Sequence, residues 1–126
     1  MDMTFGTFIR QQRQSKGYSL RQLAAEAGLS PVYMSNIEND RRPAPVQDLM
    51  DKLAEVLDLC KSEYELMLDL AAKSHDQRVS SDLPDYIMDR DIVRAALRTA
   101  KEADATDQEW QEFIDRINQR LADSKG

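Results

Sequence analysis

The chain is poor in the residues that build covalent cross-links and metal sites. Its 126 residues include one cysteine, Cys60, and one histidine, His75. A single cysteine excludes an internal disulfide, which fits a reducing, cytoplasmic setting. One cysteine and one histidine also make no convincing metal cluster. We therefore expect a fold that forms without a metal ion or any other cofactor.

Long apolar stretches are absent as well. No run approaches the roughly 20 apolar residues that a membrane helix needs. The first four residues lack the basic and apolar regions of a signal peptide. The sequence therefore predicts no membrane segment. Hydrophobic residues make up 41% of the chain and charged residues 32%, which suits one domain, or one small domain with an appendage.

Candidates for catalysis are equally scarce. The chain has no Gly-rich phosphate loop. His75 lies in a polar stretch, where a solvated loop residue is the simpler interpretation. Cys60 lies between two expected helices and is interpreted as a small buried side chain rather than a redox sensor. The sequence therefore does not predict an enzyme.

Charge is unevenly distributed along the chain. The net charge is −6, which argues against a protein that coats nucleic acid indiscriminately. Residues 1–45 nevertheless carry six basic and four acidic side chains, whereas residues 46–126 carry eleven basic and nineteen acidic ones. The first third is therefore weakly basic. A local basic face there can attract phosphates, while the acidic remainder disfavours binding to every duplex.

The scarcity of turn residues indicates the fold class. Four glycines and four prolines leave few places for strand turns, and apolar residues recur at helical spacing, so we expect an all-α chain. Side chains typical of N-caps precede four helices, which are expected to end near residues 16, 27, 39 and 73. A further helix is expected over about 46–58. The N-caps are Thr4, Ser19 with Gln22, Ser30 followed by Pro31, and Ser62 with Glu65.

Polar, aperiodic residues separate two parts of the sequence. Residues 74–83 show no helical period and are interpreted as a linker between a domain over 1–73 and a C-terminal helical region over 84–126. In that region one helix is expected to about residue 102, with a break near Asp89. Thr106 and Glu109 form a capping box for a last helix.

Two short helices stand close together before residue 40. They are joined by Gly28-Leu29-Ser30, and a turn this short, with glycine at its start, forces a sharp angle between them. The spacing of the apolar residues directs one face of the second helix inward. The residues left on or beside its outer face are Pro31, Val32, Tyr33, Ser35 and Asn36.

The first half of the chain contains several motifs at fixed spacings from one another. They are Phe8-Ile9-Arg10, Arg13, Lys16-Gly17, Ser19-Leu-x-x-Leu-Ala-x-x-Ala-Gly-Leu-Ser30, Met34-Ser-x-Ile-Glu38 and a basic loop. With them, residues 5 to about 70 resemble the helix-turn-helix family of phage repressor and Cro proteins, the XRE type. The resemblance implies a five-helix DNA-binding domain. One departure is Asp40, where the family usually has glycine, although aspartate tolerates the left-handed conformation.

The resemblance implies that the helix over 31–39 enters the major groove of double-stranded DNA. Asn36 would then bond an adenine edge in two places, and Tyr33 and Ser35 would reach bases or phosphates. Val32 would touch a thymine methyl group. Core packing is the alternative for Val32 and Tyr33.

Other residues are expected to position the domain rather than to read bases. Paired arginines after the helix would meet phosphates, and helix N-termini attract anions. The resemblance also implies a structural ion pair between Arg13 and Glu38, joining the first and third helices. The expected phosphate contacts are Ser19, Arg21, Ser30, Asn39, Arg41 and Arg42.

The last helix carries an apolar stripe that needs burial. We expect this stripe to pack on the helix over 84–102, and the two helices to contribute to a homodimer. Such proteins usually gain affinity by dimerising on a two-fold site, because one module covers few base pairs. The stripe comprises Trp110, Phe113, Ile114 and Ile117.

Three functional hypotheses remain open from the sequence. The first is a repressor that binds a two-fold operator as a homodimer. The second is the antitoxin of a toxin–antitoxin pair, whose C-terminal half binds the toxin while the helix-turn-helix regulates its own gene. The acidic half also suits docking of another regulator, or destruction by a protease that relieves repression.

Overall fold

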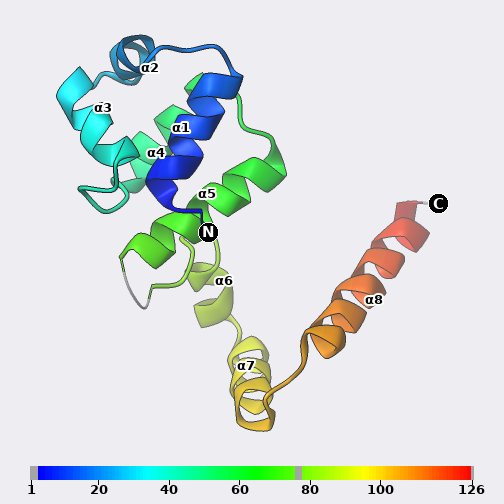
Figure 1. The fold of residues 1–126 in the computed structure, drawn as a ribbon. Helices are drawn as coiled ribbons and strands as arrows, with labels where there is room; N and C mark the ends of the chain where they lie inside the picture. The colour runs from blue at the N-terminus through cyan, green and yellow to red at the C-terminus, as the bar shows by residue number, and fades with distance from the viewer. Residues whose placement is uncertain (1–2, 76–77, 126) are drawn as a thin grey trace. The chain divides into compact units, whose positions relative to one another are not determined.

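The computed structural model describes residues 3–75 and 78–125, and every regular element in these ranges is a helix (Figure 1). The prediction of an all-α chain is therefore confirmed. The chain divides into two compact units, Met1–Pro84 and Asp85–Gly126, which are described separately below. The helices are α1 (Phe5–Ser15), α2 (Leu20–Ala27), α3 (Pro31–Glu38), α4 (Gln47–Val56), α5 (Lys61–Ser74), α6 (Pro84–Asp89), α7 (Asp91–Ala103) and α8 (Asp107–Lys125).

Side chains define where the first three helices begin. The Thr4 hydroxyl accepts a hydrogen bond from the Thr7 N–H at 3.1 Å, and the Ser30 hydroxyl accepts one from the Tyr33 N–H at the same distance. Ser19 and Gln22 form a reciprocal capping box. Each bond satisfies a backbone donor that the first helical turn leaves without a partner. The predicted caps of these three helices are confirmed.

The start of the fifth helix was predicted incorrectly. The capping box is formed by Cys60 and Glu63, not by Ser62 and Glu65, and the Glu63 carboxylate accepts the Cys60 N–H at 2.9 Å. That bond lowers the pKa of Glu63. Helix α4 ends early, because Asp58 adopts a left-handed conformation (φ 51°) and the chain turns there. Cys60 consequently lies at an exposed helix N-terminus, not in the core.

The apolar core of the first unit joins all five of its helices. Helix α1 packs against α3 and α5, and α2 packs against α3 and α4 (Figure 1). Short α2 and α3 are too small to be stable in isolation, so their apolar faces hold them in place. The fully buried side chains of this core include Phe8, Ile9, Leu23, Met34, Ile37, Leu53, Leu57, Met67 and Leu68.

The segment expected to be a linker lies largely against the first unit. Ser80 is buried and its hydroxyl donates to the Asp69 carboxylate. Ser81 donates to Gln47 at 2.5 Å. The His75 ring lies 2.8 Å from the Ala44 carbonyl oxygen, so it is a structural contact and not a solvated loop residue. The two remaining residues of the expected linker, 76 and 77, lie outside the described ranges.

The second unit has no buried residue among those described. Arg90 has extended backbone between α6 and α7, which confirms the predicted break near Asp89. Thr106 and Glu109 form the predicted capping box of α8. Arg94 donates hydrogen bonds to the Ile87 and Met88 carbonyl oxygens of α6 and to the Asp91 carboxylate.

The expectation that the α8 stripe packs on the preceding helix is wrong. Trp110 is 37% exposed, Phe113 52% and Ile114 47%, and Ile117 is half-buried. Trp110 and Phe113 meet edge to face, with ring centroids 6.2 Å apart. Apolar periodicity reports that a face needs a partner but not which partner, so the sequence could not decide this point. Within the described ranges, no helix is long and apolar enough to cross a bilayer.

Gly6 provides a test of how closely α1 approaches α3. A Cβ atom at this position would lie 2.5 Å from the Ile37 carbonyl oxygen and 2.6 Å from that of Glu38. Neither backbone atom can move without separating the helices. We expect Gly6→Ala to lower the free energy of unfolding by about 2 to 3 kcal/mol, measured by urea unfolding followed by circular dichroism. Gln14→Ala, an exposed change on the same helix, is the control, and equal stability of both variants would contradict the packing.

Candidate nucleic-acid interface

Helices α2 and α3 are held at an angle by a three-residue turn. Gly28 has a left-handed backbone (φ 75°), which glycine adopts without steric cost, and Ser30 then caps α3. Met34 and Ile37 fix the inner face of α3 in the core, where both are fully buried. The opposite face of α3 is therefore open to solvent.

Four residues predicted to contact bases lie on or beside this outer face. Val32 is 71% exposed, so the alternative of core packing for this residue is wrong. Tyr33 is half-buried and packs against the edge of the core, so it has both an inner and an outer contact. Ser35 and Asn36 are also half-buried.

Two arginines extend the outer face beyond the end of α3. The Arg42 guanidinium lies over the Tyr33 ring, 5.2 Å from its centroid, and Arg41 approaches the Asn36 amide oxygen at 3.5 Å. Both arginines are exposed. Positive charge therefore borders the polar side chains of α3. This arrangement suits a nucleic acid, whose phosphates are negatively charged and whose base edges carry hydrogen-bonding groups.

The other expected phosphate contacts divide into two groups. Ser19 and Ser30 use their hydroxyl oxygens as cap acceptors, so each keeps a hydroxyl hydrogen to donate. Arg21 is exposed on the first turn of α2. Asn39 differs, because its side chain turns back onto α3: its amide nitrogen donates to the Ser35 carbonyl oxygen at 2.9 Å and to the Ser35 hydroxyl at 3.2 Å.

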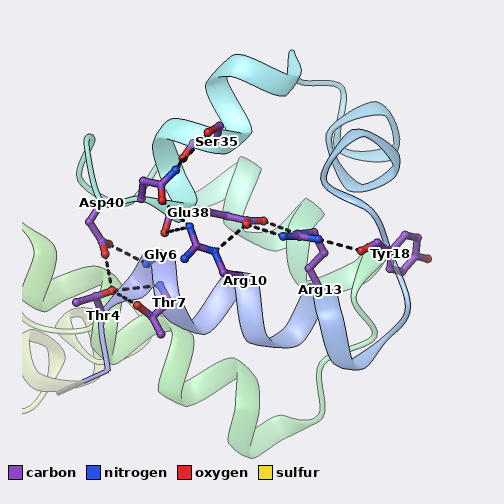
Figure 2. A network of polar contacts seen from close by, with 10 residues as sticks. Thr4, Gly6, Thr7, Arg10, Arg13, Tyr18, Ser35, Glu38 and Asp40 are labelled. Carbon is purple, nitrogen blue, oxygen red and sulfur yellow. Dashed lines mark hydrogen bonds and ion pairs between the residues drawn. The ribbon is translucent and has the colours of Figure 1, made fainter. Parts of the chain in front are cut away.

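A buried carboxylate connects α3 to α1 (Figure 2). The Glu38 side chain is 1% exposed and accepts two bonds from Arg13, at 2.7 and 3.0 Å. Arg13 also donates to the Tyr18 carbonyl oxygen at 3.1 Å. The bond to Glu38 raises the pKa of Arg13 against the opposing effect of burial. Arg13 and Glu38 thus form the ion pair that the family resemblance implied.

Arg10 is a member of this network that the sequence analysis gave no role. It reaches Glu38 at 3.5 Å and donates to the Asn39 amide oxygen at 2.5 Å (Figure 2). A signal was present in the sequence, since Arg10 precedes Arg13 by three residues and therefore shares its helix face. Its partner on α3 was not predictable from that spacing.

Asp40 replaces the expected glycine without loss of the left-handed turn. Its φ is 57°, and its carboxylate accepts bonds from the Gly6 N–H at 2.9 Å and the Thr4 hydroxyl at 2.6 Å. These bonds join the end of α3 to the start of α1, as Figure 2 shows. The contacts offset the strain of a non-glycine residue in this conformation.

The geometry described above defines a helix-turn-helix, with a polar outer helix bordered by arginines. A family model described as helix-turn-helix matches residues 9–64. The HTH-type transcriptional regulator SinR of Bacillus licheniformis is 32% identical over 84 residues, which are 67% of this chain and 74% of the relative. The SinR protein of Bacillus subtilis (strain 168) matches with the same identity and coverage.

A solved structure also matches. The crystal structure of SinR, described as the master regulator for biofilm formation, in complex with DNA is 36% identical. The match covers 52% of this chain and 100% of that chain, with a TM-score of 0.47. From its curated relatives, this chain belongs to the family of HTH-type transcriptional regulators. It is a DNA-binding regulator of transcription.

The Arg13–Glu38 pair provides a test of what holds the interface in place. Arg13→Met leaves the buried Glu38 carboxylate with only its longer contact to Arg10, at 3.5 Å, so we expect it to lower the free energy of unfolding by about 3 kcal/mol. Thermal and urea unfolding measure this loss. Arg21→Met removes an exposed arginine from the neighbouring helix and is expected to change stability by less than about 0.5 kcal/mol. Similar losses for both variants would show that Glu38 does not depend on Arg13.

Proposed function

We propose that this chain is a repressor that binds a two-fold DNA operator as a homodimer, with α3 in the major groove. The single observation that carries the proposal is the outer face of α3. It presents Ser35 and Asn36 outward while Met34 and Ile37 are buried behind them. Such a regulator acts on chromosomal DNA, so we assign it to the cytoplasm.

In this proposal the N-terminal part and the outer face of α3 contact the DNA bases. Asn36 is suited to a bidentate contact with adenine N6 and N7, because its amide carries one donor and one acceptor group. Val32, the most exposed apolar side chain of α3, suits contact with a thymine methyl group. Tyr33 and Ser35 reach neighbouring bases or phosphates.

Groups around that face contact phosphates and position the domain on the DNA duplex. Arg41 and Arg42 neutralise phosphates at the end of α3, and Arg21 with the hydroxyls of Ser19 and Ser30 meets phosphates on the other side. These contacts supply affinity and salt dependence but carry no sequence information.

The exposed apolar side chains of the second unit support dimerisation. Ile92 of α7 is 68% exposed, and in α8 Phe113 is 52% and Leu121 49% exposed. Large apolar side chains gathered on amphipathic helices indicate a protein interface. A second copy is the partner we propose, because two copies bring two recognition helices to one operator.

The same surface also suits a different protein partner, which keeps the antitoxin hypothesis as the second candidate. The observation in its favour is that apolar side chains of α7 and α8 are exposed in a single chain whose second half is acidic. A toxin or another regulator would then cover these helices while the first unit remains on DNA.

Selection on random duplex DNA tests the proposed base contacts. We expect Asn36→Ala to lose preference at particular base pairs, because it removes groups that read base edges. Arg41→Ala should instead weaken binding to all sequences alike and reduce the slope of affinity against salt by roughly one unit. Fluorescence anisotropy over a salt series measures both effects. An equal loss on all sequences for Asn36→Ala would contradict its assigned role.

Sedimentation velocity tests the proposed dimer. Ile114→Glu places a charge in the α8 stripe, so we expect the variant to sediment as a monomer and to lose at least tenfold in affinity for a two-fold operator relative to a half-site. Gln119→Glu adds the same charge on the opposite face of α8 and is expected to remain dimeric. A monomeric wild-type chain would contradict the homodimer and leave the second candidate in its place.

A further inference from the structure

Arg10 contacts α3 at three atoms although Glu38 already has a full partner. Its guanidinium donates to the Asn39 amide oxygen at 2.5 Å and approaches the Glu38 carbonyl and carboxylate oxygens at 3.4 and 3.5 Å. Arg13 holds the same carboxylate with two shorter bonds. The shortest contact of Arg10 is therefore with Asn39, which indicates that Arg10 acts mainly on the Asn39 side chain.

The bond from Arg10 fixes which way the Asn39 amide points. A guanidinium has donors only, so the atom of Asn39 that faces Arg10 must be the oxygen. The amide nitrogen then faces Ser35, where it donates to both the carbonyl oxygen and the hydroxyl oxygen. Both polar atoms of Asn39 are thus occupied within the protein.

This arrangement determines which hydrogen-bonding role the Ser35 hydroxyl favours. Its oxygen accepts from Asn39, so one of its two lone pairs is occupied, and the accepted bond polarises the O–H group toward donation. Within the described ranges no protein acceptor takes the hydroxyl hydrogen. Figure 2 shows Ser35 at the end of a chain of contacts that begins at Arg10 and Glu38.

We propose that Arg10, acting through Asn39, is a positioning residue that holds Ser35 as a hydrogen-bond donor toward DNA. Ser35 then favours a base edge that presents an acceptor, such as a purine N7, guanine O6 or thymine O4, and disfavours the N4 donor of cytosine. Without Arg10, the Asn39 amide is no longer held in one orientation, and the Ser35 hydroxyl loses the accepted bond that favours donation. This inference rests on the proposed function, in which α3 lies in the major groove.

The inference also changes the role of Asn39. Because its amide oxygen binds Arg10 and its nitrogen binds Ser35, Asn39 orients a neighbour and does not bind phosphate. Loss of Asn39 should therefore alter base preference. A phosphate contact would instead change affinity for all sequences by the same factor.

The test measures base preference, which a purely structural role would not move. All single base-pair variants of the selected operator are titrated with the wild-type chain and with Ser35→Ala, Arg10→Met and Arg10→Lys. We expect Ser35→Ala and Arg10→Met to lose the same preference, roughly fivefold, at the same base pair of each half-site. Arg10→Lys should retain most of it, because an ammonium group also donates to the Asn39 oxygen.

The control is Lys16→Met, which removes one exposed cation at the C-cap of α1, together with its bond to the Asp58 carbonyl oxygen. It is expected to lower affinity equally for all operator variants and to leave every base preference intact. Melting curves confirm that Arg10→Met is folded, as expected while Arg13 still holds Glu38. If Arg10→Met behaves like Lys16→Met, then Arg10 is only an electrostatic contact and the inference is overturned.

A second variant tests the relay without touching Arg10. Asn39→Asp keeps an acceptor for Arg10 but removes the donor that faces Ser35, so it should lose the same base preference as Ser35→Ala. In the combined variant Ser35→Ala with Arg10→Met, the second change should add no further loss of that preference. Additive losses would overturn the relay.

The outcomes also separate this inference from the proposed function. If the wild-type chain selects no sequence, or Asn36→Ala leaves every preference unchanged, the placement of α3 in the groove fails. If Asn36→Ala relaxes specific positions while Arg10→Met does not, the proposed function stands and the role assigned to Arg10 is wrong.

Discussion

One buried carboxylate holds the recognition surface together. Glu38 ends α3 with its side chain 1% exposed, and it would be costly there without a charged partner. Arg13 from α1 supplies that partner and at the same time binds the Tyr18 carbonyl oxygen in the segment before α2. This one ion pair therefore joins α1, the segment before α2 and the end of α3. Both this attachment and the buried apolar face hold α3 in place.

Two further sets of contacts join the end of α3 to α1. Asp40 binds Gly6 and Thr4 at the start of α1. Arg10 connects Glu38 with Asn39. These bonds lie behind the outer face of α3 and use side chains that are mostly short or buried.

The two units satisfy their apolar side chains in different ways. In the first unit, α1 to α5 bury one another's faces, and even residues expected in a linker contribute contacts through Ser80 and Ser81. In the second, amphipathic α7 and α8 leave large side chains exposed in the single chain. Burial of such side chains contributes roughly 25 cal/mol per Å² removed from water, so a partner for them stabilises the protein appreciably. The helix-turn-helix and the exposed apolar side chains therefore lie in separate units of the chain.

The sequence by itself determined the local features. The caps at Thr4, Ser19 and Ser30, the turn at Gly28 and the exposed positions of α3 follow from hydrogen-bonding and spacing rules that act over a few residues. Only the tertiary structure decided the remaining features, namely the bond of Arg10 to Asn39, the contacts of Asp40, the packing of residues 78–83 and the exposure of the α8 stripe. Each depends on which segments meet across 11 or more residues of chain, as Ser80 meets Asp69. Spacing along one helix carries no information about such a partner, because the partner is chosen by the packing of the whole unit.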